Sequence, residues 1–195
     1  MAAKFDAARL KRLMSAERRT ELPPGPILEK IGLRAGQTFA DIGAGPGFFA
    51  LPAAEIVGPQ GRVFGLDVNE VMLVELRKNA ARKKLSNIEI CLIPEEGGGL
   101  PAGTDFYFLA NVFHEIDDRT AYLRDLRKRM SERSRLVIID FLKKKTKHGP
   151  PLPHRIPLQV LRELLAESGF AVERVFRPND EEYGVVARRA QGGCR

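Results

Sequence analysis

Short apolar runs rich in β-branched and aromatic residues alternate along the chain with longer amphipathic stretches. The short runs predict strands, and the stretches between them predict helices. This alternation is typical of an α/β fold in which a mostly parallel, doubly wound sheet carries helices on both faces. The predicted strands are 38–42, 62–66, 88–93, 106–110, 135–139, 171–176 and 183–187, and the predicted helices are 49–57, 70–84, 119–130 and 157–168.

Turn and cap residues refine the end of this pattern. Pro178, Asn179 and Asp180 supply turn chemistry between the last two predicted strands, so these strands are expected to form an antiparallel hairpin. The last predicted helix has Pro157 at its first helical position and Gly169 just beyond its end, which are common start and stop signals. Five alternating units followed by a hairpin are therefore expected.

Two segments lie outside this pattern. Residues 1–26 combine a short amphipathic helix with the run Pro23-Pro24-Gly25-Pro26, and the basic, proline-rich segment 141–156 follows the fifth predicted strand. Ligands of open α/β sheets bind outside the carboxyl ends of the strands, so both segments are candidate lids, with plain connectors as the alternative. A length of 195 residues fits one domain, and a single domain over residues 1–195 is expected.

A glycine-rich turn, in the segment ADIGAGPGFFA (residues 40–50), joins the first predicted strand to the first predicted helix. Glycines remove side chains where the backbone turns sharply and approaches a ligand closely. The spacing is G-x-G-x-G, with Asp41 two residues before the first glycine. The dinucleotide fingerprint needs a glycine where Phe48 stands, and the Walker pattern needs a Lys-Ser or Lys-Thr pair that is absent. The turn therefore argues against a nicotinamide-dependent dehydrogenase and a phosphate-binding loop.

Asp67 follows the second predicted strand directly. A carboxylate at this place is suited to accept hydrogen bonds from ribose hydroxyls. Alternatively, Asp67 caps the N-terminus of the helix predicted at 70–84. Together with the glycine turn, the ribose role is favoured.

Over residues 27–187 the chain resembles the class I S-adenosyl-L-methionine (SAM)-dependent methyltransferases. ADIGAGPGFFA looks like the first motif of that family, VFGLDVNEVML looks like the second, and DFYFLANVFHEIDD resembles the fourth strand and its following turn. The chain is most similar to the compact small-molecule branch that includes quinone-biosynthesis and arsenite methyltransferases, although it lacks the cysteines expected for arsenite methylation. The resemblance implies a seven-stranded Rossmann-like sheet of order 3-2-1-4-5-7-6 with strand 7 antiparallel.

The resemblance also implies ten cofactor contacts, with S-adenosyl-L-homocysteine as the product. Contacts to the methionine part of SAM fall to Asp41, Gly43, Ala44, Gly45, Gly47 and Asn111. Among these, Asp41 would hold the ammonium group. Contacts to the nucleoside fall to Asp67 at the ribose hydroxyls, Val68 and Met72 on the adenine, and Glu95 at the adenine amino group. The run Gly97-Gly98-Gly99 predicts that the helix between the third and fourth strands is short or missing.

Candidate catalytic residues follow the fourth predicted strand. Because SAM carries an electrophilic methyl group, the protein mainly has to align the acceptor, and a base is needed only when the acceptor must lose a proton. His114 and Glu115 are the candidates for that base. The alternatives are that His114 is a wall of the methionine pocket, which we favour, and that Glu115 is an acid near the start of a helix.

Composition limits the partners. The net charge of +7 comes from clusters that are not interleaved with aromatic residues, so nucleic acid stays open but is less favoured than a small-molecule acceptor. No apolar stretch approaches the roughly 20 residues of a membrane span. Two cysteines and three dispersed histidines predict no metal site and favour the cytoplasm. The rival hypotheses are an RNA methyltransferase and a SAM-binding module without catalysis; the sequence identifies neither acceptor nor oligomeric state.

Overall fold

The computed structural model describes residues 12–95 and 98–191. Expectations for residues 1–11, 96–97 and 192–195, including the start of the N-terminal extension and Gly97, lie outside the described residues. The strands form a seven-stranded sheet in the order β3-β2-β1-β4-β5-β7-β6, which confirms the expected α/β topology. The chain divides into two compact units, residues 1–95 and 96–195, and each is described by itself below.

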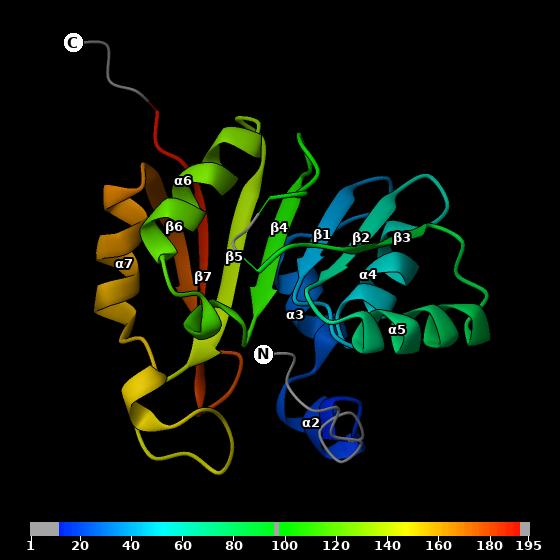
Figure 1. Cartoon of the computed structure of the whole chain (residues 1–195), viewed down its shortest axis with the longest axis horizontal. Helices are drawn as coiled ribbons and strands as arrows, with labels where there is room; N and C mark the ends of the chain where they lie inside the picture. The colour runs from blue at the N-terminus through cyan, green and yellow to red at the C-terminus, as the bar shows by residue number, and fades with distance from the viewer. Residues whose placement is uncertain (1–11, 96–97, 192–195) are drawn as a thin grey trace. The chain divides into compact units, whose positions relative to one another are not determined.

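The first unit carries three parallel strands (Figure 1). Its buried centre includes Phe39, Leu66, Leu73 and Leu76. Helix α4 packs on the three strands and α5 packs on β2 and β3. Parallel pairing brings the carboxyl ends of these strands to one edge. The elements of this unit are α2 (Ala16–Glu21), α3 (Pro24–Ile31), β1 (Thr38–Ile42), α4 (Ala50–Val57), β2 (Arg62–Asp67), α5 (Glu70–Arg82) and β3 (Ile88–Leu92).

Helix α3 was not expected from the sequence, because its first turn contains two prolines. Pro24 is the first residue of this helix, where a missing N–H and a fixed φ angle do no harm. Ile27, Leu28 and Ile31 are buried along one side of the helix, and burial of this apolar face stabilises it. The proline run is therefore the start of a helix and not a connector.

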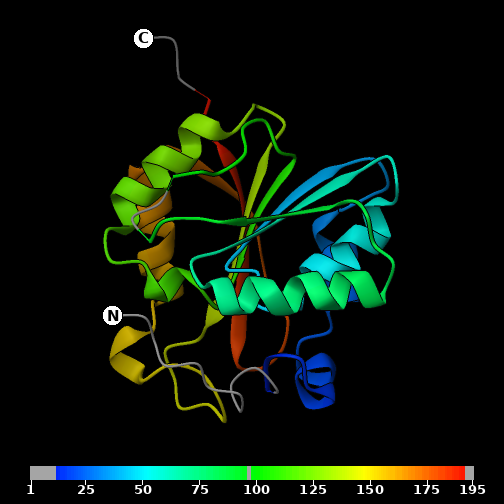
Figure 2. The ribbon, with the colours of Figure 1, turned by 45° about the vertical axis from the view of Figure 1, so that its right-hand side comes forward.

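The second unit places β7 between β5 and β6, antiparallel to both, while β4 and β5 are parallel. This arrangement confirms the hairpin predicted from the turn at residues 178–180. Helices α6 and α7 lie side by side in Figures 1 and 2. The elements are β4 (Phe106–Ala110), the 3₁₀ turn η1 (Phe113–Glu115), α6 (Arg119–Arg129), β5 (Arg135–Phe141), the 3₁₀ turn η2 (Leu152–His154), α7 (Leu158–Glu167), β6 (Phe170–Phe176) and β7 (Glu182–Arg189).

Three details of this region bear on the sequence predictions. Pro157 caps α7 instead of being its first helical residue, and Gly169 follows the C-cap with φ +80°, as a helix stop requires. Between β3 and β4, none of residues 93–95 and 98–105 is helical, in agreement with the expected loss of a helix there. Of the helices described, none is both long and apolar enough to cross a bilayer.

Candidate functional site

The glycine turn after β1 is built from left-handed backbone conformations. Gly43, Gly45 and Gly47 have φ values of 74°, 54° and 97°, a region that side chains disfavour. The N–H groups of Gly43 and Ala44 both donate to the Leu66 carbonyl, at 2.8 and 2.9 Å, which folds the turn back onto the end of β2. The turn therefore has a fixed shape beside the carboxyl ends of two strands.

Gly45 and Gly47 are needed for different reasons. A Cβ atom on Gly47 would lie 2.5 Å from Leu76 Cδ1, so packing against α5 excludes a side chain. A Cβ atom on Gly45 would meet no other atom within 4 Å. The space beside Gly45 is therefore open for a ligand.

Asp67 ends β2 and is only 8% exposed. Its Oδ2 accepts the N–H of Gly45 at 2.8 Å, and its Oδ1 accepts the N–H of Asn69 at 2.9 Å. The interpretation of Asp67 as the cap of α5 is wrong, because the N-cap is Asn69, whose Oδ1 accepts the N–H groups of Val71 and Met72. The Asp67 carboxylate instead joins the glycine turn to β2.

Asp41 is a buried acid with an unpartnered oxygen. Its side chain is 3% exposed, and its Oδ2 has no hydrogen-bond partner among the described residues. Burial raises the pKa of Asp41 from 3.8 to about 7; the Ala50 N–H at the start of α4 opposes this shift, Asp67 adds to it, and Arg18 opposes it. An ammonium group would satisfy the unpartnered oxygen, so the residues present fit the amino-acid end of SAM.

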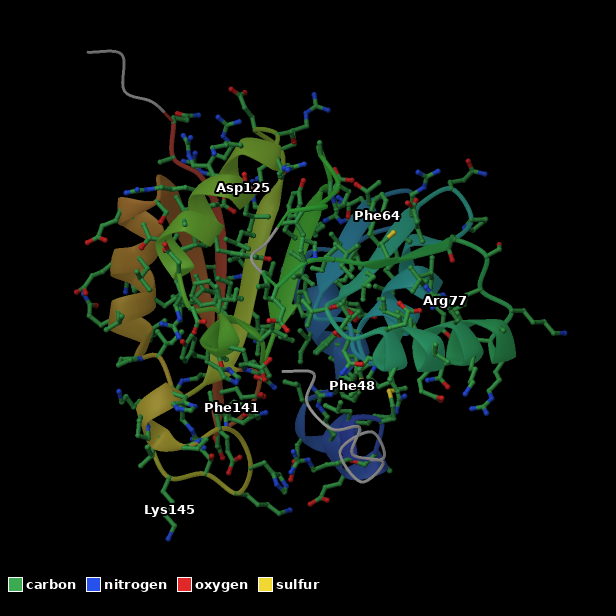
Figure 3. The ribbon with its side chains drawn as sticks, viewed as in Figure 1. Phe48, Phe64, Arg77, Asp125, Phe141 and Lys145 are labelled. Carbon is green, nitrogen blue, oxygen red and sulfur yellow. The ribbon has the colours of Figure 1, made fainter. Side chains whose placement is uncertain are left out.

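Arg18 reaches this turn from helix α2. Its guanidinium lies 4.1 Å from the centre of the Phe48 ring, which is buried and packs edge-on against Phe49. Phe48, labelled in Figure 3, stands where a dinucleotide fingerprint has glycine. Part of the N-terminal extension thus lies against the glycine turn.

The residues expected at the adenine differ in exposure. Val68 is 48% exposed and Met72 is buried, while Glu95 is exposed and has no hydrogen bond or ion pair to another described residue. Leu92 pairs with Asp67 in the β2–β3 register and is 56% exposed. Val68 and Leu92 therefore form an exposed apolar flank beside Asp67, and the sequence analysis did not identify Leu92.

In the second unit, Asn111 follows β4 in a left-handed conformation, with φ +61°. Its Nδ2 donates to Glu182 Oε1 at 2.6 Å, and its Oδ1 is buried without a partner among the described residues. Glu182, at the start of β7, is 3% exposed and also accepts the side-chain amide of Asn179 at 2.8 Å. Strained backbone and buried polar groups of this kind cluster at functional sites.

His114 is held by Asp140, a fully buried acid of β5. Asp140 accepts the backbone N–H of His114 at 3.0 Å and that of Phe141 at 2.8 Å, and its Oδ1 lies 2.8 Å from His114 Nδ1, within hydrogen-bond distance. The His114 side chain is 8% exposed, and its Nε2 lies 4.0 Å from the exposed carboxylate of Glu115. The imidazole is thus fixed by one acid and faces another.

Asp140 and Glu182 were both missed by the sequence analysis. Asp140 had a usable signal, because it directly follows an apolar strand, as Asp67 does. Glu182 had none, because it comes directly after a turn and its neighbours Asp180 and Glu181 are equally acidic.

The basic segment 141–156 is organised by Arg155, which is 5% exposed. Its guanidinium donates to four backbone carbonyls within this segment and lies 5.2 Å from the Phe141 ring centre. Arg155 is therefore a structural residue, while Lys143, Lys144 and Lys145 are exposed; Figure 3 shows Lys145 pointing away from the loop. The four carbonyls belong to Leu142, Lys144, His148 and Pro150.

The family described as "Methyltransferase domain" matches residues 33–171. Over 67 residues the chain is 43% identical to the aklanonic acid methyltransferase DauC of Streptomyces sp. (strain C5), covering 34% of this chain and 30% of that protein. It is 28% identical over 118 residues to the ubiquinone/menaquinone biosynthesis C-methyltransferase UbiE of Hahella chejuensis, covering 60% and 47%. The matches thus span less than half of these two curated relatives.

Among solved structures, the chain is similar to a SAM-dependent methyltransferase from Aquifex aeolicus. The two are 30% identical with a TM-score of 0.88, and the match covers 96% of this chain and 100% of that one. The near-complete overlap with this structure and the family match over residues 33–171 both agree with the sequence motifs quoted above. The chain belongs to the SAM-dependent methyltransferase family.

Proposed function

We propose that this chain transfers a methyl group from SAM to a small-molecule acceptor and leaves S-adenosyl-L-homocysteine. The observation that carries the proposal is the pairing of the glycine turn with the Asp67 carboxylate, beside the buried, unpartnered Oδ2 of Asp41. The names of the relatives DauC and UbiE, which specify aklanonic acid and quinone biosynthesis, support a small-molecule acceptor.

In this proposal, each part of the site in the first unit has one task. Asp41 holds the ammonium group, and the backbone of Gly43, Ala44, Gly45 and Gly47 follows the methionine part. Asp67 binds the ribose hydroxyls, because the hydrogen bonds from Gly45 and Asn69 already fix the direction of its carboxylate. Val68 and Met72 pack on the adenine, with Glu95 near its amino group.

Asn111 is proposed to meet the methionine end from the second unit, where Glu182 holds its side-chain amide. When bound, SAM supplies a methyl group on a positively charged sulfur. The protein's residues then have to exclude water and align the acceptor, and good alignment contributes about 7–11 kcal/mol to lowering such a barrier.

We further propose that both units form a single methyltransferase domain, which the match over residues 33–171 supports. We propose that residues 1–26 and 141–156 border the edge of the sheet at which the ligands bind. The contact of Arg18 with the Phe48 ring supports this role for the first segment. The second segment follows β5 directly in the chain, which supports the same role for it. A cytoplasmic location is proposed from the low cysteine content.

Titration calorimetry with SAM and S-adenosyl-L-homocysteine tests the proposal. We expect saturable binding that is lost in Asp67→Ala and retained in Glu55→Gln, which alters an exposed ion pair of the same unit. Absence of binding at millimolar SAM would reject the assignment. Binding of SAM without turnover of any acceptor would indicate the non-catalytic module, and tight, salt-sensitive retention of rRNA or tRNA on filters would indicate an RNA methyltransferase.

A further inference from the structure

The basic segment 141–156 carries a run of lysines that no acid neutralises. Four of the five residues 143–147 are lysines, and residues 141–162 contain no aspartate or glutamate. Three of the lysines are exposed, and their side chains make no hydrogen bond or ion pair with another described residue: Lys143, Lys144 and Lys145. Their positive charges are therefore available to an anionic partner.

The basic cluster on α5 differs in this respect. Three of its side chains form ion pairs at 2.6–2.8 Å with acids of the same unit: Arg77 with Glu70, Lys78 with Glu75, and Lys83, directly after the helix, with Glu55. Paired charges produce a weak field at a distance, whereas unpaired charges of one sign attract a surface of the other sign. The lysine run is therefore the stronger candidate for an anionic surface.

Apolar side chains are exposed on the same segment. Leu152, in the turn η2, is 46% exposed, and its neighbours Pro151 and Pro153 are exposed as well. An exposed leucine beside lysines suits the boundary between water and lipid, because the leucine enters the acyl region while the ammonium groups stay among the headgroups.

Arg155 holds the lysine run and the apolar turn together. Its backbone N–H donates to the Leu152 carbonyl at 3.2 Å, and its guanidinium donates to the Lys144 carbonyl at 2.7 Å. Both therefore lie in one ordered loop, drawn in yellow, which projects beyond the end of β5 in Figures 1 and 2. A loop that is already ordered loses little conformational entropy on binding.

The segment is less suited to nucleic acid. Single strands bind to basic grooves that also present aromatic rings, on which the bases stack. Phe141 is the only aromatic residue of segment 141–156, and its half-buried ring packs against Arg155 and the backbone of Gly149. Residues 141–156 therefore offer no open aromatic platform, and a contact with phosphates alone has no use for the exposed Leu152.

We propose that segment 141–156 is a membrane-docking surface, which attaches the protein reversibly to a bilayer that contains anionic phospholipid. The exposed lysines lie among the headgroup phosphates, and Leu152 enters the boundary of the acyl chains. A cluster of four to eight basic residues is typical of binding to anionic lipid, and each contributes about fivefold to partitioning. Because the cluster is small, the attachment depends on the lysines and on Leu152 together.

The first experiment is flotation of the whole protein with vesicles, without SAM or an acceptor. Vesicles of equal parts phosphatidylcholine and phosphatidylglycerol should bind the protein, and vesicles of phosphatidylcholine alone should not. Binding should weaken as salt is added, because the range of the attraction shortens to about 8 Å at physiological ionic strength. Partitioning about 10²-fold weaker is expected for the combined variant Lys143→Gln, Lys144→Gln, Lys145→Gln.

The matched control removes the same net charge from α5. The combined variant Arg77→Gln, Lys78→Gln, Lys83→Gln should partition as the wild-type protein does, because its basic side chains are paired with acids. An equal loss of binding in both combined variants would mean that only the net charge of the protein matters, and would overturn the proposed surface.

The second experiment tests insertion of Leu152. Leu152→Ser should weaken binding by a similar factor at every salt concentration, because the contribution of this side chain is apolar. A polarity-sensitive fluorophore on Leu152→Cys, in a protein without its two native cysteines, should shift its emission to the blue when anionic vesicles are added. The same fluorophore on Ala166→Cys, exposed in the last turn of α7, should not respond.

The wild-type comparison of the two vesicle compositions decides the role of charge even where a variant fails to fold. Equal binding to both compositions, or no binding to anionic vesicles at low salt, would overturn the proposal. Salt-sensitive retention of tRNA or rRNA on filters by a protein that ignores vesicles would assign the lysine run to nucleic acid instead. An unchanged fluorophore at position 152 in vesicle-bound protein would overturn the insertion.

Discussion

Asp67 and Gly45 are joined by a hydrogen bond of 2.8 Å, from the glycine N–H to Oδ2 of the carboxylate. These residues lie 22 positions apart in the sequence: Gly45 is in the turn that follows β1, and Asp67 is the last residue of the neighbouring parallel strand β2. The bond means that the carboxylate proposed for the ribose and the backbone proposed for the methionine part are positioned together. A change at one residue is therefore expected to disturb both.

Asp67→Ala should raise the Kd of SAM at least tenfold and lower stability. The half-buried Gly45 N–H loses its acceptor, and loss of such a charge-assisted hydrogen bond costs about 1.5–3 kcal/mol. Asp67→Asn should be intermediate, because one oxygen remains to accept from Gly45. Calorimetry and thermal unfolding check both effects, with Glu55→Gln as the control; unchanged affinity in a folded Asp67→Ala protein would remove Asp67 from the site.

Substitutions at Gly45 and Gly47 should separate binding from folding. Gly47→Ala should unfold the protein at lower temperature, because the new Cβ would lie 2.5 Å from Leu76 Cδ1. Gly45→Val should cost only the strain of a left-handed residue, about 1–2 kcal/mol. It should nevertheless abolish SAM binding, because its side chain fills open space beside the turn. Normal affinity in Gly45→Val would contradict the proposed path of the methionine part.

Stability should depend on pH through Asp41, whose folded pKa is raised to about 7. Between pH 3.8 and about 7 the folded state binds more protons than the unfolded state, so stability falls as pH rises through this window. Asp41→Asn removes this loss. As the pH rises, the free energy of unfolding of the variant should therefore exceed that of the wild type by an increasing amount, up to about 4 kcal/mol above pH 7. Urea unfolding at a series of pH values measures this difference. A constant difference between the two proteins would be inconsistent with the burial argument.

SAM binding should show the opposite trend with pH. An ammonium ligand requires the ionised form of Asp41, so wild-type affinity should fall about tenfold for each pH unit below about 7. Calorimetry in buffers of different ionisation enthalpy should detect proton release on binding that grows toward one proton as the pH falls below about 7. Asp41→Asn should bind weakly and lose this pH dependence; proton release that persists in the variant would assign it to another group.

Arg155→Lys should loosen the segment 141–156 while keeping its charge. The guanidinium makes hydrogen bonds to four carbonyls, and a lysine ammonium has only three donors without the planar fork. We expect faster amide hydrogen exchange at residues 142–150 and a lower unfolding temperature. Arg162→Lys, at an exposed position of α7, should change neither. Unaltered exchange in Arg155→Lys would mean that other contacts hold the loop.

The sequence predicted the strands, the hairpin and the polar residues at the ends of β1 and β2, because these depend on local periodicity and turn chemistry. It missed α3, whose two prolines are harmless only because they occupy the first turn. It also missed the hydrogen bonds between His114 and Asp140 and between Asn111 and Glu182, which join residues 26 and 71 positions apart. Such pairs depend on which strands become neighbours, and an isolated acid in the sequence does not carry that information.

The reversed direction of β7 has a practical use. Because β7 is antiparallel to β5, its first residue, Glu182, lies level with Phe141 at the edge where Asp140 and Asn111 are found. Its other end, near Ala187, lies level with Leu136 at the opposite edge of the same unit. A fluorophore or affinity tag attached downstream of Arg189 is therefore separated from the edge with His114 and Asn111 by the length of β7, about 20 Å. Protein labelled there is suitable for the binding and turnover assays.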